Sequence, residues 1–176
     1  PGLRNTTCGW RPAEAILALP PDVVADLVRP AGHFNVKARK VQEFCRVLLE
    51  EYDGSIDALL EGDAEAVRAR LLGIWGVGPE TADAMTLYAG RLPTFVVDAY
   101  TYRLCERLEL APGARQYERY RRVLLEAVGH DVTRLNEWHA LIVRHGQQTC
   151  RRSAPRCEAC PLARRCDFAR AMEGVK

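Results

Sequence analysis

Lysine is scarce in this sequence of 176 residues, since only Lys37, Lys40 and Lys176 occur among its 25 basic residues. An enzyme that forms a Schiff base needs an amine, and arginine cannot replace lysine in that role. Long apolar runs are also missing, which excludes a membrane span of about 20 apolar residues. No charged and then apolar leader precedes a small-residue cleavage site, so secretion is not indicated.

Two further patterns are missing, and their absence narrows the fold class. There is no convincing alternation of apolar and polar residues, as half-buried strands would require, and no repeat of solenoid period. Apolar residues recur at helical spacing instead. We therefore predict an all-α protein whose helices cover residues 13–19, 21–29, 36–52, 56–60, 63–72, 79–89, 98–108, 117–128 and 133–146.

The seven cysteines are an odd number, which fits a reducing cytoplasm better than a disulfide scaffold. Three of them are scattered along the chain, and we expect them to be small buried apolar residues: Cys8, Cys45 and Cys105.

The other four cysteines lie in the stretch CRRSAPRCEACPLARRC, separated by six, two and five residues: Cys150, Cys157, Cys160 and Cys166. Disulfides, a zinc site and an iron–sulfur cluster are the three interpretations, because four thiolates can bind either metal.

Charge is distributed unevenly along a chain with a net charge of only +2. Residues 144–170 contain seven arginines and two acids, whereas residues 50–83 contain nine acids and two arginines. A basic cluster is typical of a nucleic-acid-binding surface, although a single such run is also common on an ordinary solvated face.

A short glycine-rich connection, LLGIWGVGPETAD, lies between two predicted helices at residues 71–83. Gly76 and Gly78 flank Val77, and their amides with the start of the helix at Pro79 could cradle an anion. An ordinary turn between helices is the alternative. Because Pro-Glu-Thr-Ala follows, the segment looks like a helix-hairpin-helix element that binds a DNA phosphate, with Thr81 in its first helical turn.

Asp98 follows the apolar residues of PTFVVDAYTYRLCERL, residues 93–108, and is predicted to begin a helix as its N-cap. At this distance from the hairpin, the segment resembles the Gly/Pro-rich loop and aspartate of the endonuclease III superfamily of DNA glycosylases. The spacing of the four cysteines matches the four-iron–four-sulfur motif of this family, and the resemblance extends over about residues 22–167.

This resemblance implies a helix-hairpin-helix glycosylase fold with two helical lobes. One lobe would comprise residues 20–130, with the hairpin and the catalytic Asp98. The other would comprise residues 1–19 and 131–176, with a 4Fe-4S cluster bound by the four clustered cysteines. The cluster would fold its loop so that Arg151, Arg152 and Arg156 face a phosphate backbone.

The sequence departs from the family pattern at Glu80, where bifunctional members carry the lysine that forms an imine. A carboxylate cannot form this bond, so the resemblance implies a monofunctional glycosylase in which Asp98 stabilises the positively charged sugar. Two alternatives stay open: a bifunctional enzyme for oxidised pyrimidines that uses another amine, and a non-catalytic DNA-binding protein.

The expected partner is duplex DNA with a damaged base, bound by a monomer in the cytoplasm at the nucleoid. The family also has an early glutamine-rich helix, for which Asn5-Thr6-Thr7 is too weak a counterpart. Four aromatic residues could stack on a flipped base, although aromatic residues at helical spacing more often belong to the core: Trp75, Tyr88, Tyr100 and Tyr102. Trp75 is the strongest candidate for stacking, because it lies next to the hairpin.

Overall fold

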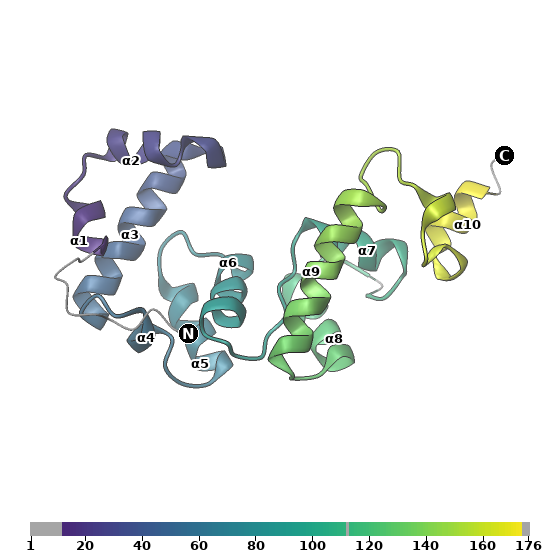
Figure 1. The fold of residues 1–176 in the computed structure, drawn as a ribbon. Helices are drawn as coiled ribbons and strands as arrows, with labels where there is room; N and C mark the ends of the chain where they lie inside the picture. Colours follow the sequence, from purple (N-terminus) through teal and green to yellow (C-terminus); the bar gives the residue numbers. More distant parts are fainter. Residues whose placement is uncertain (1–11, 112, 174–176) are drawn as a thin grey trace. The chain divides into compact units, whose positions relative to one another are not determined.

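The computed structural model describes residues 12–111 and 113–173. These residues form helices and loops without a strand, which confirms the all-α prediction (Figure 1). Among them, no helix is both long and apolar enough to cross a bilayer. The α-helices are α1 (Pro12–Leu17), α2 (Pro21–Leu27), α3 (Phe34–Tyr52), α4 (Ile56–Leu59), α5 (Ala64–Gly73), α6 (Pro79–Ala84), α7 (Ala99–Arg107), α8 (Tyr117–Val128), α9 (Val132–Gln148) and α10 (Asp167–Glu173).

The described residues also form four shorter helical segments: η1 (Arg29–Ala31), η2 (Met85–Ala89), η3 (Cys157–Ala159) and η4 (Ala163–Arg165). The predictions for Cys8 and for Asn5-Thr6-Thr7 lie outside the described residues. Cys45 and Cys105 are buried, as predicted.

The helix predicted over residues 79–89 is α-helical only to Ala84 and continues as the π-helix η2. The wider turn is closed by a hydrogen bond from the Gly90 amide to the carbonyl of Met85, at 2.9 Å. A Cβ atom at Gly90 would lie 2.8 Å from the carbonyl oxygen of Thr86, so glycine lets the chain leave the helix here. A helical period in the sequence does not distinguish this turn from an α-helical one.

The chain divides into two compact units. The first contains residues up to Gly62 together with Ala69–Val77, and in it α1 and α2 both pack on α3 (Figure 1). Val24, Ala25 and Ala38 form a buried cluster between α2 and α3. Because α3 ends at a left-handed Asp53, the chain turns at once into α4, which Ser55 caps through the amide of Ala58 at 3.1 Å.

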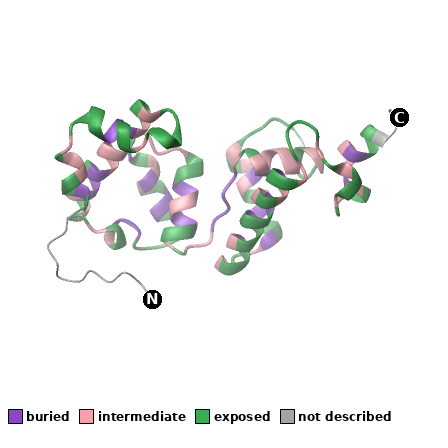
Figure 2. Ribbon diagram, turned by 45° about the horizontal axis from the view of Figure 1, so that its top comes forward, coloured by how far each residue is buried: buried purple, intermediate pink, exposed green. Residues whose placement is uncertain are grey.

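The second unit contains Asp63–Arg68 and the chain from Gly78 onward. Its core lies between α7, α8, α9 and η2, where Figure 2 shows buried positions along the inner faces of the helices. Helices α7 and α9 approach closely at Gly146, where a Cβ atom would lie only 2.5 Å from Tyr100 Cδ1. Glycine makes this approach possible. The large buried side chains of this core include Leu87, Phe95, Tyr120 and Leu135.

A buried ion pair explains why the first part of α5 belongs to the second unit. Asp83 is fully buried and accepts hydrogen bonds from Arg68 Nε at 3.0 and 3.1 Å. The same carboxylate accepts a 2.5 Å hydrogen bond from Thr94 Oγ1. The Thr94 hydroxyl in turn accepts a hydrogen bond from Arg121 at 3.2 Å. Arg68 further binds Glu118, so residues of α5, α6 and α8 meet in one network.

The predicted lobes and the compact units are divided differently. The prediction groups residues 1–19 with residues 131–176, whereas the first compact unit includes α1, which packs on α3. Residues 1–11 lie outside the described part of the chain, and the grouping of the two ends into one lobe therefore stays a prediction.

We expect Asp83→Ala to lower the free energy of unfolding by about 3–5 kcal/mol, because it leaves the Arg68 guanidinium buried without its partner. Chemical denaturation measures this loss. Glu65→Gln is the matched control, since it removes a carboxylate from the same network that is 65% exposed, and should cost no more than about 1 kcal/mol. Equal losses in the two variants would contradict a dominant role for the buried pair.

Candidate functional site

The hairpin between α5 and α6 has the backbone that its glycines predict. Gly76 has φ of +88°, which favours glycine, and a Cβ atom there would lie 2.5 Å from Cγ of Lys40. The Val77 amide donates to the carbonyl of Ile74 at 3.0 Å and closes the turn. Thr81, in the first turn of α6, is exposed.

Gly78 differs from Gly76, because nothing inside the protein requires glycine there. Its φ of −93° suits any residue, and no atom lies within 4 Å of the position that a Cβ atom would take. Gly78 caps α6 without a side chain, and its carbonyl accepts from the Ala82 amide at 2.9 Å. The open space beside this backbone leaves room for a ligand to approach it.

Asp98 is the N-cap of α7, as the sequence predicts. Its Oδ1 atom accepts hydrogen bonds from the Thr101 amide at 2.7 Å and from Thr101 Oγ1 at 2.9 Å. The Asp98 side chain is only 14% exposed. The carboxylate is therefore held in one orientation through one oxygen, while Oδ2 points to another neighbour.

This neighbour is His139 of α9, whose Nε2 atom lies 3.7 Å from Asp98 Oδ2. Burial alone would raise the pKa of Asp98. The interaction with His139 and the two hydrogen bonds from Thr101 outweigh burial, so the pKa lies below its ordinary value. Asp98 is consequently a carboxylate at neutral pH even though it is half-buried.

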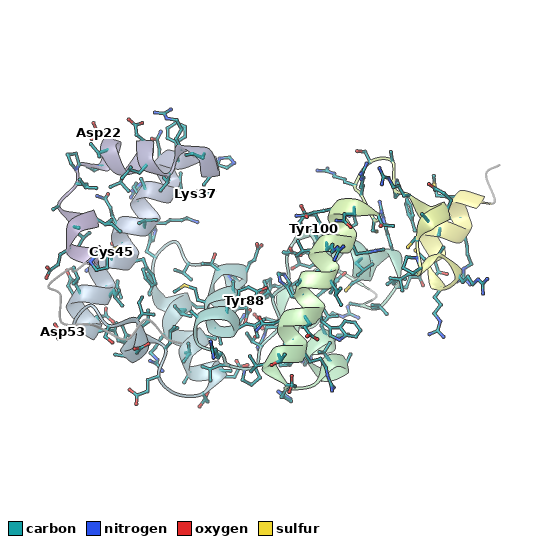
Figure 3. The ribbon with its side chains drawn as sticks, in the orientation of Figure 1. Asp22, Lys37, Cys45, Asp53, Tyr88 and Tyr100 are labelled. Carbon is teal, nitrogen blue, oxygen red and sulfur yellow. The ribbon has the colours of Figure 1, made fainter. Side chains whose placement is uncertain are left out.

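His139 is also bound on its other side. Its Nδ1 atom shares a hydrogen bond with the hydroxyl of Tyr88, which is labelled in Figure 3 and belongs to η2. The edge of the Phe95 ring packs against the imidazole, with 6.4 Å between the ring centroids. Tyr88, His139 and Asp98 thus form a row of polar groups that comes from three separate segments of the chain.

Glu80 lies within electrostatic reach of the same groups. Burial, followed by the negative charge of Asp98, raises the pKa of Glu80, and His139 opposes this rise. The residue as a whole is nevertheless exposed, so water reaches its carboxylate. Glu80 and Asp98, the two residues to which the sequence assigned chemistry, therefore interact electrostatically.

The four clustered cysteines line one cavity, together with residues of α7, α10 and the intervening loop: Arg107, Thr149, Pro155, Arg156, Phe168 and Ala169. In the described part of the chain, no three ligand side chains lie close enough to share one metal ion. The four thiols around one cavity suit a metal centre, either zinc or an iron–sulfur cluster.

Two arginines of α7 fasten the cysteine loop to the core of the second unit. Arg103 donates to the carbonyls of Cys150 and Gly146 at 2.7 and 2.9 Å. Arg107 donates to Cys150 Sγ at 3.1 Å and to the Arg151 carbonyl at 2.9 Å. The guanidinium of Arg107 also lies over the Phe168 ring, 4.1 Å from its centroid.

The loop exposes the three arginines to which the sequence assigned phosphate contacts: Arg151, Arg152 and Arg156. Arg107 holds the backbone carbonyls of Arg151 and Arg152, and the Arg156 amide donates to the Thr149 carbonyl at 3.0 Å. Arg151 Nε also donates to the Gln147 carbonyl at 3.3 Å, and Arg156 borders the cysteine cavity. Of the aromatic candidates, Trp75 and Tyr88 are exposed, whereas Tyr100 and Tyr102 pack against the core.

Sequence reasoning missed His139, Arg103 and Arg107. His139 did carry a signal, because it falls on the buried stripe of α9 with Leu135, Ile142 and Gly146. A histidine on an apolar stripe needs a polar partner, but the sequence does not reveal which one. The two arginines are one helical turn apart on α7, and nothing in their spacing indicates that they bind the cysteine loop.

Three comparisons relate the chain to known proteins. A family model described as "HhH-GPD superfamily base excision DNA repair protein" matches residues 6–130. A Methanocaldococcus jannaschii protein provisionally named a DNA repair glycosylase is 37% identical over 152 residues, which cover 86% of this chain and 69% of that protein. Endonuclease III of Escherichia coli strain K12 is 30% identical over 154 residues, with coverages of 88% and 68%.

Solved structures give a similar result for the fold. A trapped covalent intermediate of endonuclease III with DNA matches with a TM-score of 0.80 at 22% identity, covering 93% of this chain and 72% of that one. A thermostable thymine-DNA glycosylase matches with a TM-score of 0.67 at 22% identity, with coverages of 92% and 71%. At these identities the similarity establishes the fold.

Proposed function

Since the chain belongs to the HhH-GPD superfamily of base excision DNA repair proteins, we propose that it is a monofunctional DNA glycosylase. It removes a damaged base from duplex DNA by hydrolysis of the N-glycosidic bond, with Asp98 as the catalytic carboxylate. The proposal depends chiefly on one observation: a half-buried aspartate is held rigidly and kept ionised at the start of a helix.

The charge of Asp98 suits the reaction. As a base departs, positive charge develops on the deoxyribose, and a carboxylate that is already fixed in place stabilises that charge without reorganising. Thr101 holds Oδ1, so the carboxylate does not need to be oriented when DNA arrives. The target nucleotide must first leave the base stack, and the exposed ring of Tyr88 is a candidate to contact it.

Glu80 supports the monofunctional form of the proposal. A carboxylate cannot attack C1′ to form an imine, and a raised pKa beside Asp98 does not change this. Of the described lysines, Lys37 donates to the carbonyl of Ala31 and Lys40 packs over Gly76. We assign no nucleophilic role to either.

Duplex DNA would bind through its phosphates. The open backbone at Gly78 gives a phosphate access to the hairpin amides, with Gly76, Val77 and Thr81 completing the contact. Arg151, Arg152 and Arg156 add positive charge from the cysteine loop. These contacts carry no base readout, which suits an enzyme that must inspect any sequence as a monomer at the nucleoid.

Cys150, Cys157, Cys160 and Cys166 would hold a 4Fe-4S cluster, since all four line one cavity. When bound, the cluster supplies folding energy to a loop that has little apolar core of its own. Arg107 would donate to the Cys150 sulfur and thereby offset the negative charge of the thiolates.

Asp98→Asn should abolish base release, because it removes the charge that stabilises the sugar cation. DNA binding should remain or become tighter, since the amide does not repel phosphate. The fold should persist, because asparagine caps a helix nearly as well as aspartate. Single-turnover base release over a panel of damaged duplexes, with thermal melts of both proteins, measures these effects.

The same reactions in borohydride test the monofunctional assignment, and we expect little or no covalent adduct with DNA. Efficient trapping that Lys37→Ala or Lys40→Ala abolishes would show a bifunctional enzyme. If the parent releases no base from any duplex and Asp98→Asn behaves in the same way, a non-catalytic DNA-binding protein is favoured.

Protein purified without air should be brown and contain about four irons per chain, because the thiols fit a four-iron cluster. Elemental analysis and visible absorbance measure this content. Cys157→Ala should lower the iron content and the solubility, whereas Cys45→Ala, which changes a buried cysteine outside the cavity, should keep the iron. One zinc and no iron in the parent would contradict the assignment.

Replacing Arg151 and Arg152 by alanine should reduce the salt dependence of DNA affinity, by about one unit of log–log slope for each phosphate that the variant no longer binds. Arg122→Ala, which removes an exposed arginine of α8, is the control and should leave the slope unchanged. Fluorescence anisotropy over a range of salt concentrations measures the slope. Equal slopes in the parent and the double variant would show that neither arginine contacts a phosphate.

A further inference from the structure

We propose that His139 is a positioning residue for Asp98, and that Tyr88 sets the tautomer in which His139 acts. In this arrangement the imidazole presents an Nε2–H group to Asp98 Oδ2 and thereby keeps the carboxylate ionised and correctly oriented. The inference rests on the proposed function for its chemical consequence, but the arrangement itself concerns the protein without DNA.

The contacts of the ring determine the tautomer. Nε2 is buried, lies 3.7 Å from Asp98 Oδ2 and has no other polar partner among the described residues. A lone pair on this nitrogen would face the negative oxygen and be repelled, so a proton on Nε2 is favoured. In the neutral ring Nδ1 is then an acceptor, and it accepts from the hydroxyl of Tyr88.

The ring is held in place by packing as well as by hydrogen bonds. His139 lies on the buried stripe of α9, and Phe95 and Tyr88 contact its ring from two other segments. Tyr88 reaches Nδ1 from the π-helix η2, which packs directly on α9. A π-helical turn is unusual and frequently occurs at functional sites, and here it carries the residue that faces the histidine.

Two titratable groups contact this imidazole, Tyr88 of η2 and Asp98 at the start of α7. Glu80 of α6 interacts with it electrostatically. Burial and then the charge of Asp98 raise the pKa of Tyr88, so the phenol keeps the proton that it donates. The separation of 3.7 Å between Nε2 and Oδ2 is longer than a hydrogen bond. Catalytic contacts of this kind often shorten only when the substrate is bound.

The role is a positioning one, because His139 acts on the reacting sugar only through Asp98. Thr101 occupies one oxygen of the carboxylate and His139 faces the other, so that rotation of the group is opposed from both sides. Removing the Nε2 donor should raise the pKa of Asp98. A larger fraction of the carboxyl would then be protonated at a given acid pH, and the acid limb of base release would move to higher pH.

Two substitutions distinguish the role of the Nε2–H donor from the role of the ring in packing. The amide nitrogen of glutamine can occupy the place of Nε2, whereas that of asparagine reaches only the place of Nδ1. We expect His139→Asn to raise the pKa of Asp98 and to slow base release by about 10- to 100-fold. His139→Gln should stay close to the parent in both measurements. Tyr88→Phe should be intermediate, because without the phenol hydroxyl His139 can carry its proton on either ring nitrogen.

The experiment has two independent measurements. Nuclear magnetic resonance follows the Asp98 carboxyl carbon through an acid titration of the free protein, and single-turnover kinetics follow base release against pH. The exposed His130→Asn is the control for loss of a histidine and should change neither. Thermal melts and affinity for an abasic duplex verify that each variant folds and binds DNA.

The outcomes separate the inference from the proposed function. A higher Asp98 pKa in His139→Asn but not in His139→Gln supports the positioning role, even if the parent releases no base and the proposed function fails. An unchanged Asp98 titration in His139→Asn overturns the inference, even if the parent is an active glycosylase. An equal loss of activity in the asparagine and glutamine variants also overturns it, because the ring would then serve packing alone.

Discussion

The buried pair of Arg68 and Asp83 anchors the segment of the chain that leads to Asp98. Asp83 binds Thr94, the first residue of a fully buried segment that runs to Val97 and ends at Asp98. The far end of this segment is held as well, since the Val97 amide donates to the Tyr117 hydroxyl at 3.3 Å. A charged pair that is itself far from chemistry thereby anchors the backbone that presents the carboxylate.

The proposed site concentrates negative charge, which is unusual for a protein that binds a polyanion. Burial, and then the negative charge of Asp98, raises the pKa of Glu80. Their combined field would repel phosphate but favour a cationic sugar, so it discriminates between the ground state and the transition state of base release. The arginines of the cysteine loop and the open hairpin backbone would supply the attraction for phosphate that these two carboxylates lack.

Sequence reasoning went furthest where local chemistry decides the structure. The helix bounds follow apolar periodicity, Asp98 caps α7 through a contact three residues away, and the cysteine spacing brings four thiols to one cavity. It failed where the partner is distant in the chain. His139 is 41 positions from Asp98, Arg107 is 43 from Cys150, and neither pair has a local signature. The grouping of the two ends of the chain into one lobe stays a prediction.

The π-helical turn of η2 has a consequence for how this site could arise or be lost. Such a turn holds one residue more than an α-helical turn, so it is equivalent to a single-codon insertion in the gene. Deleting Tyr88 itself would restore an ordinary helix, because the extra residue of the turn is then removed and the residues on either side keep their places. His139 would lose its partner while every helix of the fold remained. In this chain, a change of one amino acid in length could thus break the row of polar groups without altering the scaffold that carries it.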